Sequence, residues 1–443
     1  MRSTGIVRIA VRLIGAVAMG ILAAALLVLV SLQGGTPQVE RLSPPVPEDA
    51  EYARVFMLTM EHIGRQPDRA GTVTGTPEQF NGLFRILARS NDGLRLRTDL
   101  EDGAVRLRAS VRVPGHDWVG WLNLTAVLPP SAATPEPTDL RIGALALPPG
   151  PTLRLIAWGL DQRFGPGTGA QALDMLSGLA VEGDAVTFGI TMPAGSERLL
   201  SRNAISELYG RDMVSRARVV EEVTFLEQQV AAGRLQRSGS YADWLRVVIE
   251  RAAEAGPDAT ADAVMAGFMA LNYLCGSDHF VSVLLPPSGA NDPPLPSARP
   301  GCGRADLRGR VDLRRHFTTA ATIKLISSRN AAVTAGEAKE LSDSIHSGFD
   351  FTDIAANNSG IRLAVLLDGA TPADLRALAA GIASEDDLII DLDGIPQIMG
   401  RSAFRMRFGE LDSPEYLAVI DEIERRIDAL PIHAHTVGTG REG

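Results

Sequence analysis

The chain has 443 residues, of which 45% are hydrophobic and 22% are charged, and its formal net charge at pH 7 is −10. This composition is typical of folded globular proteins and excludes a disordered chain. The negative charge and the lack of a basic surface interleaved with aromatic residues argue against a nucleic-acid partner.

An apolar segment lies near the start of the chain. Leu13–Leu32 carry no charged residue over about the ~20 residues that a helix needs to cross a bilayer. Three arginines precede it (Arg2, Arg8 and Arg12), and no Lys or Arg follows before Arg41. We therefore expect a single-pass inner-membrane anchor with the bulk of the chain in the periplasm. A cleaved signal peptide is the alternative, but the run exceeds a usual signal h-region and lacks a small-x-small cleavage site.

Two folded domains are expected in the rest of the chain, because about 100–200 residues form one domain. The predicted divisions are a cytoplasmic tip and anchor at 1–35, a Pro-rich linker at 36–52, an α+β domain at 53–196, a mostly α-helical domain at 200–432 and a tail at 433–443. The linker is expected to act as a spacer off the membrane surface.

The first domain begins with a helix and continues as an antiparallel sheet. Thr76 as N-cap, Pro77 at the first helical position and Gln79 in capping-box spacing mark the helix start. Leu94–Leu100 and Val105–Val113 alternate apolar and polar residues with period two, which predicts two paired strands. Further strands are expected within 118–129, 140–149 and 179–193, and a second helix at 153–164.

This order of elements resembles the envelope proteins of the YpmS and tubular lipid-binding type. The segments that carry the resemblance are QFNGLF on the first helix, LRIGALALPP as a late strand and VEGDAVTFGITM as a closing hairpin. Proteins of that type are membrane-anchored modules whose curved sheet and helices enclose an apolar groove. The resemblance implies a lipid-binding-like domain with a lipid or other apolar ligand; an ordinary sheet packed on its own helices is the alternative.

Five arginines fall on the polar face of the two paired strands: Arg95, Arg97, Arg106, Arg108 and Arg112. Arg grips phosphate bidentately, so this surface suits the head groups of anionic lipids. In the alternative interpretation the arginines only solvate the outer face and pair with Asp99 or Glu101.

From about residue 201 the apolar residues recur with helical spacing, which predicts a mostly α-helical domain. Its two cysteines, Cys275 and Cys302, flank a Pro-rich loop. In an oxidising compartment such a pair predicts a disulfide, with two buried thiols as the alternative.

A polar cluster is predicted in this second domain. Residues 312–326 and 331–345 are expected to form two antiparallel helices, with His316 level with Ser342 and closest to Glu340 and Asp343. A third helix is expected to follow, with Thr352 or Asp353 as its N-cap. The candidate site residues are His316, Glu340, Asp343 and Asp353.

The same region resembles the core of the YfiM-like periplasmic proteins. Their pattern is met by His316-Phe317, by Gly336 with Lys339–Leu341 and Asp343, and by Phe351–Ala356. Where relatives often carry Asp-Arg before a final Ala-Gly, this chain has Asn357–Gly360, which removes a charge pair. The resemblance implies a periplasmic protein and carries no established activity.

Three interpretations of the cluster remain open. It is a buried hydrogen-bonded network, an acid–base pair in which a carboxylate orients His316, or a divalent metal site. The sequence contains no HExxH, G-x-S-x-G, Walker A or CxxC motif, so no known spacing supports catalysis or a metal, and no cofactor is predicted.

The sequence thus predicts a membrane-anchored periplasmic protein that binds lipid or an envelope protein partner. The alternative is an envelope hydrolase acting on peptidoglycan or lipid, with Glu340 as proton donor. Whether the protein is an enzyme is left undecided by the sequence.

Overall fold

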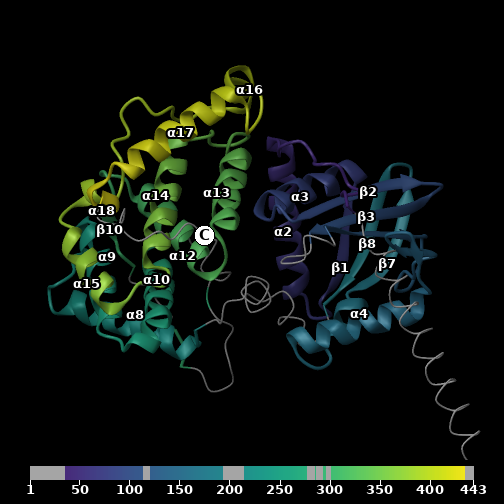
Figure 1. Ribbon diagram of the computed structural model, residues 1–443, viewed down its shortest axis with the longest axis horizontal. Coiled ribbons are helices and arrows are strands. Elements are labelled where there is room, and N and C mark those ends of the chain that lie inside the picture. Colours follow the sequence, from purple (N-terminus) through teal and green to yellow (C-terminus); the bar gives the residue numbers. More distant parts are fainter. Residues whose placement is uncertain are drawn as a thin grey trace, which may run out of the picture. The chain divides into compact units, whose positions relative to one another are not determined.

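The computed structural model describes residues 35–112, 120–192, 214–276, 285, 293–295 and 301–434. The fold is mixed α+β, as predicted, and divides into two compact units (Figure 1). Unit 1 comprises Met1–Ser43 and Leu58–Pro193, and unit 2 comprises Pro44–Met57 and Ala194–Gly443. The predicted span Leu13–Leu32 lies outside the described residues. Within the described ranges, no helix has both the length and the hydropathy needed to cross a bilayer.

Unit 1 contains a five-stranded antiparallel sheet. Its strands, in spatial order, are β2 (Leu94–Glu101), β3 (Ala104–Arg112), β4 (Trp121–Leu128), β5 (Asp139–Ile142) and β6 (Leu145–Ala146). The β2–β3 turn has Asp102 at φ 52° and Gly103 at φ 73°. Two positive φ angles are what a tight two-residue hairpin requires, so the predicted hairpin is confirmed.

A second sheet of unit 1 has the order β1 (Ala70–Gly75), β8 (Ala185–Thr191), β7 (Leu176–Glu182). Helix α3 (Pro77–Ser90) starts with the predicted capping box of Thr76 and Gln79. Its Asn81 donates to the carbonyl of Thr98 at 3.0 Å and accepts from the amide of Thr98 at 2.8 Å. These bonds cover the open edge of β2, which would otherwise expose unpaired backbone groups.

The segment predicted to be a spacer is bonded to the sheet of unit 1 at its start. The amide of Gln38 donates to Asn123 Oδ1 at 2.8 Å, and the amide of Val39 donates to Ser110 Oγ at 3.1 Å. Helix α2 (Pro47–Arg65), which the sequence did not reveal, follows and contributes its first half to unit 2. Residues 36–52, predicted as a linker, thus include a segment bonded to the sheet of unit 1 and the start of α2.

Unit 2 is mostly helical. Its helices are α8 (Arg216–Ala231), α9 (Ala242–Ala253), α10 (Thr260–Cys275), α12 (Val311–Ile326), α13 (Arg329–Asp343), α14 (Phe351–Leu367), α15 (Pro372–Gly381), α16 (Arg401–Phe408), α17 (Pro414–Asp428) and α18 (Pro431–Ala434), with short 3-10 turns η1 (Pro257–Ala259) and η2 (Glu385–Asp387). Helices α10, α12 and α14 pack together at its centre (Figure 1). Two short strands, β9 (Ser238–Ser240) and β10 (Arg304–Asp306), form a parallel pair that the sequence did not predict.

A disulfide joins the end of α10 to the chain ahead of β10. Cys275 and Cys302 are paired with their Cα atoms 5.1 Å apart, as predicted. The buried Arg314 of α12 donates to the carbonyl of Cys275 at 3.1 Å and to the carbonyl of Gly303 at 3.3 Å. The disulfide and this guanidinium fix the start of α12, from which His316 projects.

Candidate functional site

Three helices of unit 2, α12, α13 and α14, hold the predicted cluster, and two glycines set how closely they pack. A Cβ atom at Gly360 of α14 would lie 2.2 Å from the carbonyl oxygen of Phe317 on α12. A Cβ atom at Gly336 of α13 would lie 2.6 Å from the amide nitrogen of Asn357 on α14. Because glycine has no side chain, the helices approach closely at both points and their polar side chains meet.

The caps of α13 and α14 orient the site. Ser328 accepts from the amide of Ala331 at 3.1 Å, and Asp350 accepts from the amide of Thr352 at 2.8 Å. The prediction of Thr352 or Asp353 as N-cap of α14 is wrong, because the side chain of Asp350 caps the helix and leaves both residues inside its first turn. Asp353 can therefore point into the cluster.

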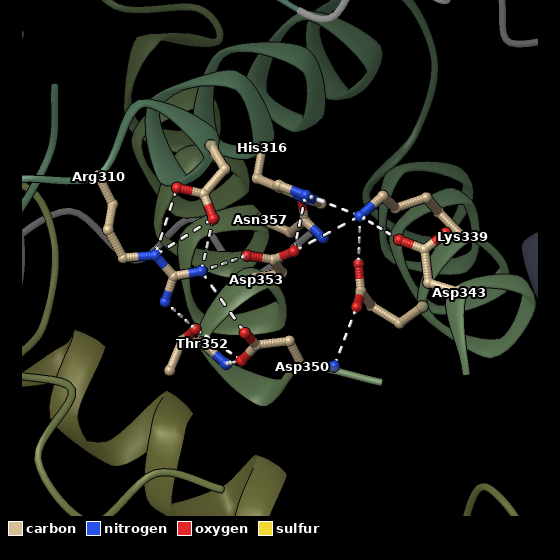
Figure 2. Close-up of polar contacts among 10 residues, drawn as sticks. Arg310, His316, Lys339, Asp343, Asp350, Thr352, Asp353 and Asn357 are labelled. Carbon is tan, nitrogen blue, oxygen red and sulfur yellow. Dashed lines mark hydrogen bonds and ion pairs between the residues drawn. The ribbon is translucent and has the colours of Figure 1, made fainter. Parts of the chain in front are cut away.

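The amino group of Lys339 is the centre of the cluster (Figure 2). Its distances to the four predicted residues are 2.9 Å to His316 Nε2, 2.9 Å to Glu340 Oε1, 2.9 Å to Asp343 Oδ2 and 3.4 Å to Asp353 Oδ2. All four predicted candidates therefore contact one cation. An ammonium group has only three hydrogens, so it cannot donate to four acceptors at once.

Asp353 joins this centre to a second cation. Its Oδ2 lies 2.9 Å from His316 Nε2, and its Oδ1 lies 3.3 Å from Arg310 Nη2. Figure 2 shows Asp353 between Arg310 on one side and Lys339 on the other. Arg310 also pairs with Asp312 at 2.6 Å, so the cluster is one connected network of charges.

Both ring nitrogens of His316 are engaged. Nδ1 lies 3.2 Å from Asn357 Oδ1, which can only accept a hydrogen bond. Nε2 faces both Asp353 and Lys339, and one nitrogen cannot donate to the carboxylate while it accepts from the ammonium. A proton on Nε2 therefore favours the contact with Asp353, and a bare Nε2 favours the contact with Lys339.

Burial acts differently on the titratable groups of the cluster. Glu340 is 0% exposed, and burial raises its pKa to about 7 against the opposing charge of Lys339. Burial also acts to raise the pKa of Asp353, but the hydrogen bond from His316 and the nearby cations outweigh it and hold this pKa below its ordinary value. Burial acts to lower the pKa of Lys339, yet its carboxylate neighbours outweigh burial and raise that pKa.

His316, Glu340 and Asp353 have the residue types and the spacing of a three-ligand metal site, because one ligand atom from each lies within 4.8 Å of the others. Zinc sits about 2.0–2.2 Å from nitrogen and oxygen ligands, so an ion bound by all three would need the place held by the amino group of Lys339. A metal ion and the inward position of Lys339 therefore exclude each other.

A cavity of 260 Å³ opens beside the cluster. Its polar lining residues are Asp312, Arg315, His316, Thr319, Lys339, Asp353 and Asn357, and its apolar ones are Ala320, Ile323, Ala332 and Ala335. Neither Glu340 nor Asp343 lines it. Among the described residues, Arg315 has no ion-pair partner, and the buried amide nitrogen of Asn357 has no hydrogen-bond partner. The cavity thus has unused donors and an apolar wall.

The four residues predicted from the sequence do lie together, but the contacts predicted for His316 are wrong. His316 was expected to face Glu340 and Asp343, whereas its direct partners are Lys339, Asp353 and Asn357. Because α12 and α14 approach closely at Gly360, the imidazole of His316 lies near α14. No local pattern in the sequence assigns Arg310 or Asn357 to the site, and the i, i+4 spacing of Lys339 and Asp343 is the one signal for the central role of Lys339.

In unit 1, the strand register places the predicted arginines on one face of the β2–β3 pair, with Arg97 opposite Arg108 and Arg106 opposite Asp99. Asp99 pairs with Arg97 at 3.1 Å and also with Arg108, and Glu101 pairs with Arg106 at 2.9 Å. The guanidinium of Arg95 lies 4.7 Å from the ring centre of Trp121. Five guanidinium groups and two carboxylates leave this arginine face a formal surplus of three positive charges.

Comparisons of the chain with protein-family models, with curated proteins and with solved structures found no match. The functional assignment below therefore rests on the residues and geometry of the site.

Proposed function

We propose that this chain is a single-pass protein of the inner membrane whose periplasmic part binds a small amphipathic ligand, a lipid head group or a related molecule of the envelope. The observation that carries the proposal is the cavity between α12, α13 and α14, in which the free Arg315 and an apolar wall lie beside a closed ion network. An envelope protein that presents such a group is the expected partner.

The proposed location rests on the sequence and on the disulfide. An uncharged apolar run preceded by three arginines favours an anchor with its basic end in the cytoplasm. The disulfide between Cys275 and Cys302 suits an oxidising compartment such as the periplasm. A reporter fused after Gly443 is expected to be active only outside the cytoplasm, and a cytoplasmic signal would overturn this location.

The size and chemistry of the cavity define its ligand. Pockets for drug-sized molecules measure about 300–1,000 Å³, so a cavity of 260 Å³ suits a head group or a short chain and excludes a whole diacyl lipid. Arg315 offers a planar set of donors that matches a carboxylate or a phosphate. Ile323 and Ala332 offer an apolar wall to the uncharged part of the ligand.

Binding fits the site better than turnover. A general base needs a free nitrogen, and both nitrogens of His316 are engaged. A nucleophilic amine must be neutral, whereas the carboxylates around Lys339 raise its pKa and keep it protonated. Glu340 is fully buried beside Lys339 and does not line the cavity, so it cannot contact a molecule bound there.

Native mass spectrometry of the full chain released from lipid nanodiscs tests this proposal. The wild-type protein is expected to carry a small anionic adduct, and Arg315→Gln is expected to lose it. Arg425→Gln, on the exposed side of α17, is the matched control and should keep the adduct. A wild-type chain without any adduct, or an adduct retained by Arg315→Gln, would contradict binding in this cavity.

One observation favours the hydrolase instead. The pKa values of Glu340 and Asp353 are shifted in opposite directions, a pattern typical of an acid and a base that act together. In that case Glu340→Gln should abolish release of product from peptidoglycan or lipid while the protein remains as stable as the wild type. A Glu340→Gln variant that is inactive and fully stable would move the assignment to the enzyme.

A further inference from the structure

Helix α4 (Pro149–Phe164) of unit 1 carries an exposed apolar face. The exposed fractions of its large side chains are 64% for Leu155, 42% for Ile156 and 59% for Trp158. Leu155 and Trp158 are three positions apart and therefore neighbours on the helix surface. A contiguous apolar patch of this kind is unusual on a soluble surface and marks an interaction site.

The opposite side of α4 is fixed to the rest of unit 1. A Cβ atom at Gly169 of α5 (Thr168–Asp174) would lie 1.9 Å from the carbonyl oxygen of Ala157, so only glycine permits this packing. The amide of Gly169 also donates to Asp161 Oδ1 at 2.7 Å. The apolar face of α4 therefore points away from its support and has a fixed orientation within unit 1.

The chain itself ties unit 1 close to the predicted membrane span. The carbonyl of Thr36 accepts from the side chain of Asn123 at 3.1 Å, so the chain is bonded to the sheet from this residue onward. Only three residues separate Thr36 from Leu32, the end of the predicted span. At about 3.3–3.6 Å per residue, Thr36 lies within about 14 Å of the end of that span.

The sheet places α4 within reach of the same surface. The amide of Gly143, in the β5–β6 turn, donates to the carbonyl of Asn123 at 2.7 Å, so this turn lies beside the attachment of Thr36. Strand β6 runs back from the turn and α4 begins at Pro149. With strands about 4.8 Å apart and about 3.3 Å of rise per residue, the start of α4 lies within about 20 Å of Asn123, whose side chain is bonded to Thr36.

The charge and residue types of this face suit a lipid bilayer. Among the described side chains of α4, the exposed charge belongs to Arg154, and the one carboxylate, Asp161, is half-buried and bonded to α5. Trp is favoured at the boundary between head groups and acyl chains, and Leu and Ile favour the apolar side of it. A helix with this face lies in the plane of the interface.

We propose that the exposed face of α4, with Leu155, Ile156 and Trp158, inserts into the interface of the bilayer that the predicted span crosses. The inference rests on the anchoring proposed above. Because the tether is short, insertion is an intramolecular event with a high effective concentration, which favours the bilayer over a second copy of the chain or a separate protein. Unit 1 is thereby held against the membrane at two points.

Tryptophan quenching in vesicles tests the inference with the full chain. The protein is reconstituted into phosphatidylcholine–phosphatidylglycerol vesicles with or without brominated acyl chains, which quench tryptophans in contact with them. The wild type is expected to lose fluorescence in brominated vesicles, and W158F is expected to lose most of this quenching. W244F is the control, because Trp244 is fully buried in the core of unit 2, and it should quench like the wild type. L155E should reduce the quenching of Trp158 as well.

Flotation of the same vesicles on a density gradient separates the two proposals. If the protein fails to float, the anchoring fails and the inference fails with it. If it floats but W158F and the wild type are quenched equally, the anchoring stands and the insertion of α4 is overturned. A third outcome would also overturn the proposal. If brominated lipid does not quench Trp158 at a low protein-to-lipid ratio, and crosslinked dimers form at a high ratio, the face binds a second copy of the chain.

Discussion

The ion pairs of the two units differ in burial, and this difference determines how much each pair contributes to stability. On the arginine face of unit 1, the side chain of Arg97 is 45% exposed and its partner Asp99 is shared with Arg108. In unit 2, Glu340 is 0% exposed and depends on Lys339 for its compensating charge. Exposed pairs are screened by water and salt, whereas a buried carboxylate has no solvent to replace a lost partner.

Charged side chains thus have different roles in the two units. The arginine face carries a formal surplus of positive charge, and its ion pairs add little to stability. The charged groups of the Lys339 cluster pair with one another, so they contribute to the packing of α12, α13 and α14. Among the described residues that line the cavity, Arg315 and the amide nitrogen of Asn357 keep donors for a ligand. The following variants are chosen to test that contrast.

Lys339→Met should have the largest effect. It removes the one cation that contacts Glu340, Asp343 and Asp353, and it leaves a fully buried carboxylate without compensation. Breaking a buried pair costs about 3–5 kcal/mol, and we expect about 3 kcal/mol because 35% of the Lys339 side chain is exposed and water screens part of the loss. Chemical denaturation measures it, with Arg106→Met in unit 1 as the control at about 1 kcal/mol or less. Equal losses for the two variants would remove the contrast between the units.

Glu340→Gln and Asp343→Asn separate burial from contact, because both carboxylates lie 2.9 Å from the same amino group. Glu340 accepts from Lys339 with one oxygen and from the amide of Asp350 at 3.0 Å with the other. Gln has a single acceptor oxygen, so one buried donor is left without an acceptor, which lowers the free energy of unfolding by about 1–3 kcal/mol. Asp343→Asn should cost less than about 1 kcal/mol, since its side chain is 30% exposed. A Glu340→Gln protein that melts at or above the wild-type temperature would contradict a structural network.

The pH dependence of stability isolates Glu340. Burial raises its folded pKa from 4.5 to about 7, so between these values the folded protein binds a proton that the unfolded chain has lost. By linkage, Glu340 makes the free energy of unfolding fall as the pH rises from 5 to 7, by at most about 1.4 kcal/mol per pH unit. Burial lowers the pKa of His433 to about 4, so His433 acts in the opposite direction up to its ordinary pKa of 6.5. Asp353, whose pKa is lowered, loses its contribution only at more acidic pH. His433 is common to all variants, so denaturation at pH 5, 6, 7 and 8 should show a more negative slope in the wild type and in Asp343→Asn than in Glu340→Gln.

Local signals in the sequence predicted most of the described elements. The capping box at Thr76 and the period-two pattern of β2 and β3 are properties of neighbouring residues, and each predicted its element. Strands β9 and β10 were missed because each is three residues long and pairs with a partner far along the chain. Helix α2 was not predicted because its start follows several prolines, a composition typical of a linker.

The site was predicted only as far as helix pairing allows. Spacing along α12 and α13 brought His316 near the carboxylates of the second helix. The contacts of His316 with Asp353 and Asn357 depend on the close packing of α14, which one glycine, Gly360, decides and which no local pattern reveals. Arg310 joins the cluster through the fold alone, since Asp350 and Asp353 lie about forty residues away along the chain.

The smallest effect on stability is expected for the arginine face, where the effect on binding should be the clearest. Replacement of Arg95, Arg106 and Arg108 by Gln in a fragment of residues 36–443 removes its three-charge surplus. Each exposed pair lost costs at most about 1 kcal/mol. Binding to anionic vesicles should nevertheless weaken and lose its salt dependence, because exposed charges act over only about 10 Å at ~0.1 M salt.

The matched control for this variant replaces arginines of unit 2 that are exposed or partly exposed: Arg401, Arg425 and Arg426. It removes the same charge from the whole fragment but leaves the arginine face intact, so vesicle binding and its salt dependence should stay at the wild-type level. If both triple variants bind equally well, the surplus charge on β2 and β3 is only a solvated surface. If both bind equally weakly, the net charge of the fragment controls binding, and the local face of unit 1 does not.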